Sequence, residues 1–320
     1  MLDALAGRRD LFDDAHASYF GLARERDDVA AGRFPTREPG FRALWDFEGG
    51  IAAILGLERP TTLLLDRALR VLAVLPIDDP ATHARQVEAI VAALPRRPAP
   101  LRADGNAPVL LVPFVFEPAF CRRLIDYYLE RGGEDSGFMR EDAEGRTVGV
   151  VDHGQKRRRD RLIEEPALRD GMRARIVRRL VPEIRRAFCF EPTRIERYIV
   201  ACYDSGEGGY FRPHRDNTTK GTAHRRFAVT INLNADDYEG GDLRFSEHDQ
   251  RTHRAPTGGA IVFACSLMHE ALPVTRGTRY CTLPFLYDEA GAKLRSDNAG
   301  FLDDPHLRDI ALGTTKQAAE

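Results

Sequence analysis

Three residues in the second half of the chain have the types and spacing of a metal site. His214 and Asp216 lie two residues apart in the stretch YDSGEGGYFRPHRD, and His269 follows 53 residues after Asp216. Side chains two residues apart on a β-strand project from the same face, so a strand here would let both hold one ion. Two imidazoles and one carboxylate leave further coordination positions open, which is typical of non-haem Fe(II) sites that activate oxygen. The three residues therefore predict oxidative chemistry.

A series of short strands is expected to position these residues. Glycine pairs at Gly240-Gly241 and Gly258-Gly259 mark turns between them. The expected strands are Thr193–Tyr203, Tyr210–Asp216, Arg226–Leu233, Asp242–Phe245, Ala260–Phe263, Leu267–Pro273 and Arg279–Tyr287. Regularly spaced short strands with glycine turns are typical of closed or sandwiched β structure, and we expect a jelly roll. A strand at Val109–Phe114 and helices at Glu117–Leu129 and Ala167–Phe188 are expected to flank it.

Several stretches of this region resemble one enzyme family. They are VACYDSGEGGYFRPHRDN, FAVTINLN, EGGDLRF, PTGGAIVF and MHEALPVTRGTRY. Residues 108–289 resemble the Fe(II)/2-oxoglutarate dioxygenases of the prolyl 4-hydroxylase type, and look most like the hypoxia-inducible-factor prolyl hydroxylases. The resemblance implies a double-stranded β-helix, or jelly roll, in which His214, Asp216 and His269 are the iron ligands. It also implies Fe(II), 2-oxoglutarate and O2 as cofactor and cosubstrates, with ascorbate as a candidate addition.

The same resemblance implies four residues for 2-oxoglutarate. Arg279, ten residues after His269, corresponds to the arginine that binds the distal carboxylate of the cosubstrate. A planar guanidinium suits that task because it can donate two parallel hydrogen bonds to a carboxylate. Tyr203 matches a tyrosine whose hydroxyl approaches the cosubstrate, and Thr282 could add a hydroxyl from the strand of Arg279. Asn232 falls where a polar inward residue of the next strand helps to hold the same carboxylate, whereas the hypoxia-inducible-factor prolyl hydroxylases have tyrosine at this position.

The resemblance implies hydroxylation of an unactivated carbon with release of succinate and CO2. Asp216 provides the carboxylate ligand, which leaves no vacancy for a halide and favours hydroxylation over halogenation. A prolyl residue of a protein is the first candidate substrate, while free amino acids, peptides and small metabolites stay open. The alternative is a non-catalytic binding or scaffold protein with a vestigial barrel and a partner-docking amino-terminal domain. Succinate formation from 2-oxoglutarate would distinguish the two.

A stretch rich in proline and arginine, Pro95–Pro108, is expected to separate two units. The predicted division is a domain at 1–96, a linker at 97–107, the jelly roll at 108–289 and a polar tail at 290–320 with at most one short helix. The amino-terminal elements are expected at Leu11-Phe12 (a helix end), Tyr19–Ala23, Gly50–Leu55, Thr61–Leu65, Leu69–Leu75 and Thr82–Leu94. Their order resembles the back half of an α/β peroxiredoxin or thioredoxin-like domain. That family works through a cysteine near its first strand, and this chain has none before Cys121, so peroxidase activity is not expected.

Composition narrows the partners. The chain has 320 residues, 43% of them hydrophobic and 30% charged, with a net charge of -2, so neither nucleic acid nor a membrane surface is an expected partner. The substrate is expected to be a protein or a small molecule. The start lacks the order of a secretory signal, so we expect a cytoplasmic protein. The five scattered cysteines are expected to be buried free thiols.

Two further groups of residues could be either ordinary solvated surface or part of a functional site. The basic run Lys156–Arg161 (KRRRDR) is expected to be a solvated face, although it could bind an acidic substrate or a phosphate. His224, His248 and His253 lie in polar stretches and are expected to be solvated.

Overall fold

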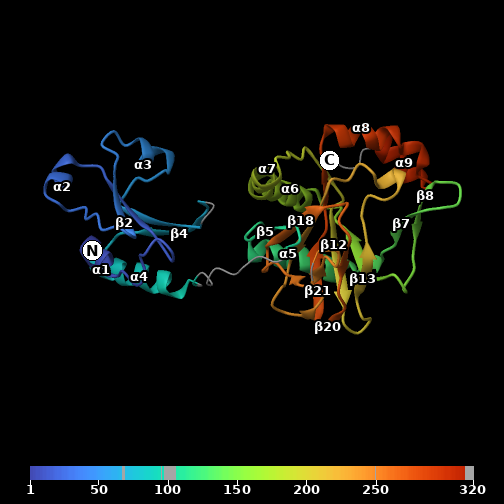
Figure 1. The fold of residues 1–320 in the computed structure, drawn as a ribbon, viewed down its shortest axis with the longest axis horizontal. Coiled ribbons are helices and arrows are strands. Elements are labelled where there is room, and N and C mark those ends of the chain that lie inside the picture. Colours follow the sequence, from blue (N-terminus) through green and yellow to red (C-terminus); the bar gives the residue numbers. More distant parts are fainter. Residues whose placement is uncertain (67–68, 95, 97–105, 249, 314–320) are drawn as a thin grey trace. The chain divides into compact units, whose positions relative to one another are not determined.

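The computed structural model describes residues 1–66, 69–94, 96, 106–248 and 250–313. It divides the chain into two compact units, Met1–Arg102 and Ala103–Glu320 (Figure 1). This division falls inside the range 97–107 that was expected to be a linker, of which residues 97–105 lie outside the described residues. The roles assigned to the two units stay predictions.

The amino-terminal unit is a mixed α/β structure. Its elements are α1 (Leu2–Gly7), β1 (Tyr19–Ala23), α2 (Arg26–Ala30), β2 (Phe41–Trp45), α3 (Gly50–Ile54), β3 (Thr61–Leu65), β4 (Val71–Pro76) and α4 (Pro80–Ala93). Strands β1 and β2 are parallel, whereas β3 and β4 form an antiparallel hairpin. The expected strands, hairpin and later helices are confirmed, but the helix expected to end at Leu11-Phe12 ends at Gly7. The thioredoxin-like relationship stays a prediction.

The carboxy-terminal unit contains eight strands in jelly-roll order. The larger sheet places β12 (Ile199–Asp204), β21 (Thr278–Thr282), β14 (Phe227–Asn232) and β18 (Ala260–Ala264) side by side. The smaller sheet places β13 (Tyr210–His214), β19 (His269–Ala271), β16 (Leu243–Arg244) and β17 (Thr252–His253) side by side. Along the chain these eight strands alternate between the two sheets, except that β16 and β17 are neighbours in the smaller sheet. This is the order of a jelly roll, so the expected fold is confirmed for this unit.

Further strands extend both sheets or form separate hairpins. The larger sheet also holds β5 (Leu110–Val112), β6 (Glu134–Asp135), β10 (Arg159–Leu162), β11 (Arg194–Glu196) and β22 (Phe285–Tyr287). The smaller sheet is extended by β9 (Lys156–Arg157). The separate hairpins are β7 (Phe138–Glu141) with β8 (Thr147–Val150), and β15 (Glu239–Gly240) with β20 (Val274–Arg276). The sequence did not indicate β6 to β10, β15, β17 or β20.

Two expected strands are divided in the structure, and several others are shorter than expected. The strand expected at 193–203 breaks into β11 and β12 at Arg197, whose φ of 72° lies in the left-handed region that a strand cannot contain. The strand expected at 279–287 breaks into β21 and β22 around Pro284, which has no backbone N–H to donate to a ladder. The strand expected at 210–216 ends at His214.

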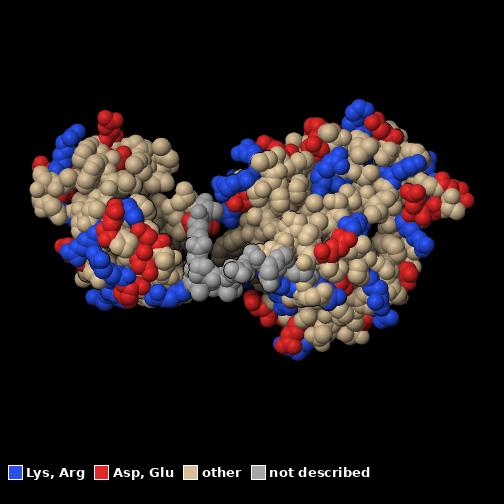
Figure 2. Space-filling model, in the orientation of Figure 1, with Lys and Arg blue, Asp and Glu red and all other residues tan. Residues whose placement is uncertain are grey.

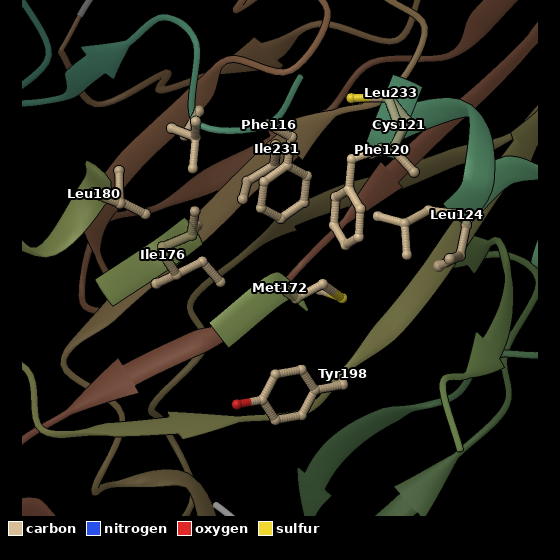
Figure 3. Close-up of a cluster of buried hydrophobic side chains, with 14 of the residues drawn as sticks. Phe116, Phe120, Cys121, Leu124, Met172, Ile176, Leu180, Tyr198, Ile231 and Leu233 are labelled. Atoms are coloured by element: carbon tan, nitrogen blue, oxygen red, sulfur yellow. The ribbon is translucent and has the colours of Figure 1, made fainter. Parts of the chain in front are cut away.

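Helices cover one face of the larger sheet (Figure 1). They are α5 (Pro118–Arg131), α6 (Pro166–Arg175), a π-helical segment (Ile176–Leu180) and α7 (Val181–Phe188). The expected helix at 167–188 is therefore confirmed, with a π segment just before Pro182, where a helical hydrogen bond is lost. Figure 3 shows the core between these helices and the sheet, where Phe120, Leu124 and Met172 pack.

Residues 290–313 were expected to be a polar tail with at most one short helix, and this expectation is wrong. After β22 the chain forms α8 (Glu289–Asp297), a short 3₁₀ helix (Ala299–Phe301) and α9 (Pro305–Leu312). The short helix expected at Pro305–Leu312 is confirmed. Leu302 and Ile310 are buried, so apolar contact holds these helices on the unit despite their polar composition. Residues 314–320 lie outside the described residues.

Strand β12 directs one side chain of the predicted site inward. Ile199, Ala201 and Tyr203 belong to the core between the two sheets, whereas Val200 and Cys202 belong to the core under the helices. Because side chains alternate across a strand, burial of both faces explains the continuous apolar run IVACY. Tyr203 thus points into the barrel.

The cysteines, charges and helices of the described residues bear on further expectations. All five cysteines are free, as expected, but Cys189 is exposed while the other four are buried. Figure 2 shows basic and acidic side chains interspersed over the visible face of each unit. Within the described part of the chain, each helix is too short or too polar to cross a bilayer.

Candidate functional site

The three predicted metal ligands meet at one end of the barrel. Nε2 of His214 lies 3.6 Å from Oδ1 of Asp216, and Nε2 of His269 lies 3.4 Å from Oδ2 of the same carboxylate. The donor atoms of all three residues lie within 4.8 Å of one another. Metal bonds to such donors are about 2.0 to 2.2 Å long, so two ligands of one ion lie within about 4.4 Å of each other. The two measured separations fit one ion.

Backbone carbonyls fix the protonation of both histidine rings. Nδ1 of His214 lies 2.7 Å from the carbonyl oxygen of Arg212, and Nδ1 of His269 lies 3.0 Å from that of Leu267. A carbonyl oxygen only accepts hydrogen bonds, so each Nδ1 carries the proton and donates it. In its neutral form each ring therefore presents the lone pair of Nε2 to the common centre, which is the tautomer that binds a metal.

The protonation states of His269 and Asp216 also favour binding of a cation. Burial lowers the pKa of His269 to about 4, against the opposing effect of the Asp216 charge. Burial by itself would raise the pKa of Asp216, but His269 and His214 hold it below its ordinary value. At neutral pH the site thus contains a carboxylate and a neutral buried imidazole, the forms that bind metal ions.

The position of Asp216 differs from the prediction. Asp216 was expected on the same strand as His214, but the strand ends at His214 and Asp216 lies in the following turn. Its backbone N–H donates to the carbonyl of Cys265, and its backbone carbonyl accepts from Nη1 of Arg225 at 3.3 Å. Hydrogen bonds from two other segments therefore hold Asp216 beside the two histidines, rather than a strand face.

Arg279 has the surroundings expected of a ligand-binding arginine. It is 2% exposed, and Nη1 donates to the carbonyl of Gly241 at 2.7 Å. Its Nε has no hydrogen-bond partner, and no carboxylate of the described residues lies within ion-pair distance of it. A buried cation without a counter-ion is costly unless a ligand supplies the negative charge. The residue therefore fits a carboxylate-bearing cosubstrate.

The other three predicted cosubstrate residues lie around Arg279. The guanidinium of Arg279 is 5.0 Å from the ring centre of Tyr203, and the two are cross-strand partners in β12 and β21. Nη2 of Arg279 lies 3.5 Å from Oδ1 of Asn232, whose Nδ2 donates to the carbonyl of Ala255. Thr282 is fully buried, with no partner for Oγ1 among the described residues. These contacts favour Asn232 as a support for Arg279.

A cavity of about 690 Å³ joins the metal ligands to Arg279. Its wall includes all three predicted ligands together with Tyr203 and Arg279, whereas Asn232 and Thr282 do not line it. Apolar side chains from both sheets complete the inner wall, namely Ile199, Ala228, Leu243, Phe263 and Ala271. A mostly apolar cavity with a few convergent polar groups is typical of small-molecule sites.

The basic run Lys156–Arg161 is only in part a solvated face. Lys156 and Arg158 are 3% and 6% exposed, and both line the cavity. Arg158 forms a two-pronged ion pair with Asp160, at 2.7 and 2.5 Å, and its Nη1 lies 3.4 Å from the hydroxyl of Tyr203. Arg157 and Arg159, in contrast, are exposed. Alternation along a strand could have indicated that Lys156, Arg158 and Asp160 share one face.

A second buried ion network stands beside Asp216, and the sequence did not reveal it. Glu196 accepts from Nη2 of Arg225 at 2.6 Å and lies 2.7 Å from Nε2 of His224. Burial alone would raise the pKa of Glu196, but Arg225 and His224 bring it well below its ordinary value. His224 is 2% exposed, so its expected solvation is wrong; His248 is exposed as expected, and His253 is half-buried.

Known proteins resemble the segment that carries these residues. Residues 198–287 match the family described as the 2OG-Fe(II) oxygenase superfamily. This match and the His-Asp-His cluster together imply Fe(II) as cofactor and 2-oxoglutarate as cosubstrate.

Curated relatives match short stretches of the chain. A PKHD-type hydroxylase of Synechococcus sp. (strain JA-2-3B'a(2-13)) is 29% identical over 101 residues, 30% of this chain and 44% of that protein. A PKHD-type hydroxylase of Maricaulis maris (strain MCS10) is 29% identical over 137 residues, 42% of this chain and 61% of that protein. The multifunctional procollagen lysine hydroxylase and glycosyltransferase of Rattus norvegicus is 37% identical over 29% of this chain and 12% of that protein. The chain thus spans less than two thirds of the length of these relatives.

Solved structures also align with the chain at low identity. A prolyl hydroxylase of Trichoplax adhaerens, in complex with a hypoxia-inducible-factor peptide fragment, is 18% identical with a TM-score of 0.43, covering 59% of this chain and 86% of that chain. A Pseudomonas putida prolyl-4-hydroxylase is 18% identical with a TM-score of 0.40, covering 56% and 92%.

Proposed function

We propose that this protein is an Fe(II)- and 2-oxoglutarate-dependent hydroxylase that oxidises an unactivated carbon and releases succinate and CO2. The observation that carries the proposal is the joint placement of three metal donors and an unpaired arginine in one cavity. Neither part alone would suffice, because buried arginines and His-Asp contacts also occur in purely structural roles.

Each residue of the site has a distinct task in this proposal. Nε2 of His214, Nε2 of His269 and the carboxylate of Asp216 hold the iron on one side. Arg279 binds the distal carboxylate of 2-oxoglutarate, with Tyr203 at its side and Asn232 behind its guanidinium. When bound, iron and cosubstrate supply an oxidant strong enough to hydroxylate a C–H bond.

The protein contributes geometry and exclusion of water. Phe211 stacks on His214 with ring centroids 3.5 Å apart, and Phe263 lies 4.5 Å from His269. These aromatic rings shield the metal ligands from bulk solvent and restrict the rotation of both imidazoles. Asp216 occupies the carboxylate position, which favours hydroxylation over halogenation as proposed from the sequence.

The proposed reaction is compatible with several substrates. A prolyl ring is the first candidate, because the chain resembles prolyl 4-hydroxylases in its motifs and the structural relatives are named as prolyl hydroxylases. The curated relatives described above are named as PKHD-type and lysine hydroxylases, so other aliphatic carbons stay open. Free amino acids and small metabolites are included among the candidates.

For residues 1–96 we propose a thioredoxin-like unit without thiol chemistry. The order of β1, β2, α3, the β3-β4 hairpin and α4 supports this proposal, as does the parallel pairing of β1 with β2. Residues 1–96 contain no cysteine. A role in stability or partner docking fits such a unit better than a redox role.

Turnover of 2-oxoglutarate tests the proposed reaction. The full-length protein with Fe(II) and air is expected to form succinate and CO2, and Asp216→Ala is expected to reduce the rate at least a hundredfold because the ion loses its carboxylate ligand. Asp237→Ala, which changes an exposed aspartate, is the matched control. A wild-type protein that binds neither Co(II) nor 2-oxoglutarate would contradict the proposal even before a substrate is known.

A further inference from the structure

The cavity contains more positive charge than iron and 2-oxoglutarate account for. Besides Arg279, six lysine and arginine residues line it: Lys156, Arg158, Arg197, Arg215, Arg225 and Arg295. Arg215 pairs with Glu247, and Arg295 donates to the hydroxyl of Tyr287. The other four cations have two carboxylates nearby, those of Asp160 and Glu196. This group of four therefore has an excess of two potential positive charges, apart from Asp216, whose charge belongs to the metal site.

Both carboxylates already accept hydrogen bonds from other side chains. Asp160 pairs with Arg158 through both oxygens, and its Oδ2 also accepts from the hydroxyl of Ser136. Glu196 accepts from Arg225 through both oxygens and from His224. Lys156 and Arg197 form no ion pair with either carboxylate, so they are the cations without a counter-ion in this part of the described structure.

Lys156 is held in place by neutral acceptors. Nζ donates to the hydroxyl of Ser136 at 2.7 Å and to the carbonyl of Gly137 at 2.5 Å. An ammonium group has three donors, so the third proton has no protein partner. Burial, then the nearby charges of Arg158 and Arg197, lower the pKa of Lys156 to about 6. A negative ligand would relieve this repulsion and restore the proton.

Arg197 is presented to the cavity at a cost in backbone energy. Its φ of 72° is the left-handed conformation, which is uncommon for a residue other than glycine and is kept where the surrounding structure or a function requires it. Nε and Nη2 both donate to the carbonyl of Leu283, and the guanidinium lies over the ring of Phe285 at 4.6 Å. Nη1 has no protein partner among the described residues, and the side chain lines the cavity.

We propose that the substrate is a small organic acid whose carboxylate is bound by Lys156 and Arg197 while an aliphatic carbon is presented to the metal site. The proposal rests on the function proposed above and names the substrate class of the same cavity. A carboxylate can accept a charge-assisted hydrogen bond from each cation, and it would balance the excess charge. A free amino acid with an aliphatic side chain has this chemistry.

The location of Lys156 favours a small molecule over a protein. The side chain is buried, so the carboxylate that binds it must enter the cavity. Leu307 and Ile310 of α9 also line the cavity, so the carboxy-terminal helices cover part of its wall. The volume of about 690 Å³ must hold 2-oxoglutarate as well, and a small acid fits the remaining space.

Binding of a model acid tests the charge requirement. The full-length protein, loaded with Co(II) and saturating 2-oxoglutarate, is titrated at pH 7 with hexanoate and with hexanamide, which have the same chain length. Hexanoate is expected to bind at least ten times more tightly, and Lys156→Met or Arg197→Gln is expected to remove most of this preference. Arg197→Lys is expected to restore part of it because the charge returns. Arg159→Met, which changes an exposed neighbour in the same run, is expected to behave as wild type.

The outcomes separate this inference from the proposed function. Failure of the wild type to bind Co(II) or 2-oxoglutarate would overturn the proposed function itself. Normal binding of both without a preference for hexanoate over hexanamide would overturn only the inference, and so would a preference that survives in both variants. Circular dichroism and thermal unfolding of each variant establish that it is folded.

A product search decides between a free acid and a protein. Cell extract is divided into a fraction of small molecules and a fraction of proteins, and each is treated with wild-type enzyme and with Asp216→Ala. Products that gain one oxygen are expected among acids of the small-molecule fraction. Products found only in the protein fraction would overturn the assignment to a small molecule.

Discussion

His214 and His269 face each other as cross-strand partners in β13 and β19, with ring centroids 4.3 Å apart. The register of these strands is irregular between Phe211 and His214, where β13 gains one residue. Without that extra residue the partner of His269 would be Pro213, and His214 would be displaced along the strand. Such bulges commonly re-aim a side chain near an active site, and proline is tolerated there because the ladder is interrupted.

Loss of either imidazole should therefore weaken metal binding strongly. His269→Ala is expected to reduce the affinity for Co(II) by about a hundredfold or more, because two of three donors remain and the buried carboxylate loses a neighbour. Isothermal titration calorimetry measures this directly. His248→Ala removes an exposed histidine and should bind Co(II) as the wild type does. Equal affinity in His269→Ala would mean that the metal binds elsewhere.

Arg279 should govern affinity for the cosubstrate more than the rate. Arg279→Lys keeps the charge but loses the planar pair of donors, so the KM for 2-oxoglutarate is expected to rise about ten- to hundredfold. Arg279→Met should raise it further because the charge is also gone. Steady-state succinate formation measures both, with the exposed Arg276→Lys as control. An unchanged KM in Arg279→Met would exclude this residue from the cosubstrate site.

Glu196 should stabilise the metal site indirectly, through Arg225. It binds Arg225 and His224, and Arg225 in turn binds the backbone of Asp216. Glu196→Gln leaves a buried guanidinium without its counter-ion, which typically costs about 3 to 5 kcal/mol. Urea unfolding should show a loss of that order, together with weaker Co(II) binding. Glu191→Gln, which breaks an exposed pair with Arg185, should change stability by less than about 1 kcal/mol.

The metal ligands and Arg279 could be found from the sequence because their chemistry restricts both residue type and spacing. Few side chains bind Fe(II), and the interval from His269 to Arg279 follows from the short path between β19 in the smaller sheet and β21 in the larger sheet. The strand order could be anticipated from glycine turns and short apolar runs. What failed was the assumption that His214 and Asp216 share a strand, since a strand end depends on its neighbours.

The other buried charged residues, Lys156, Arg158, Arg197 and Glu196, could not be found in the same way. A basic run reads as a surface unless one knows that Lys156 and Arg158 alternate inward on β9 and the segment that follows it. The orientation of Arg197 is harder to predict, because its neighbours in the sequence do not indicate a left-handed backbone conformation. Glu196 and His224 are paired only through tertiary contact. Long-range ion pairs of this kind follow from the packing of strands, not from local pattern.

The buried Lys156 should give the protein a distinctive dependence of stability on pH. Its pKa is lowered to about 6 in the folded state, from an ordinary value near 10.5 in the unfolded chain. Between these values the unfolded state binds a proton that the folded state lacks. Stability therefore rises with pH over this window, by at most about 1.4 kcal/mol per pH unit from this group. Below pH 6 both states are protonated and the contribution is constant.

Lys156→Met removes this dependence without removing the apolar stem. The variant is expected to be more stable than the wild type near pH 6 to 7, with the difference narrowing as the pH approaches 10. Urea unfolding at pH 6.5, 7.5, 8.5 and 9.5 measures the difference in the free energy of unfolding. Lys293→Met, at an exposed lysine paired with Asp297, is the matched control and should give a curve parallel to that of the wild type. A parallel curve for Lys156→Met would show that Lys156 stays protonated in the folded protein, which would require a counter-ion at its third donor.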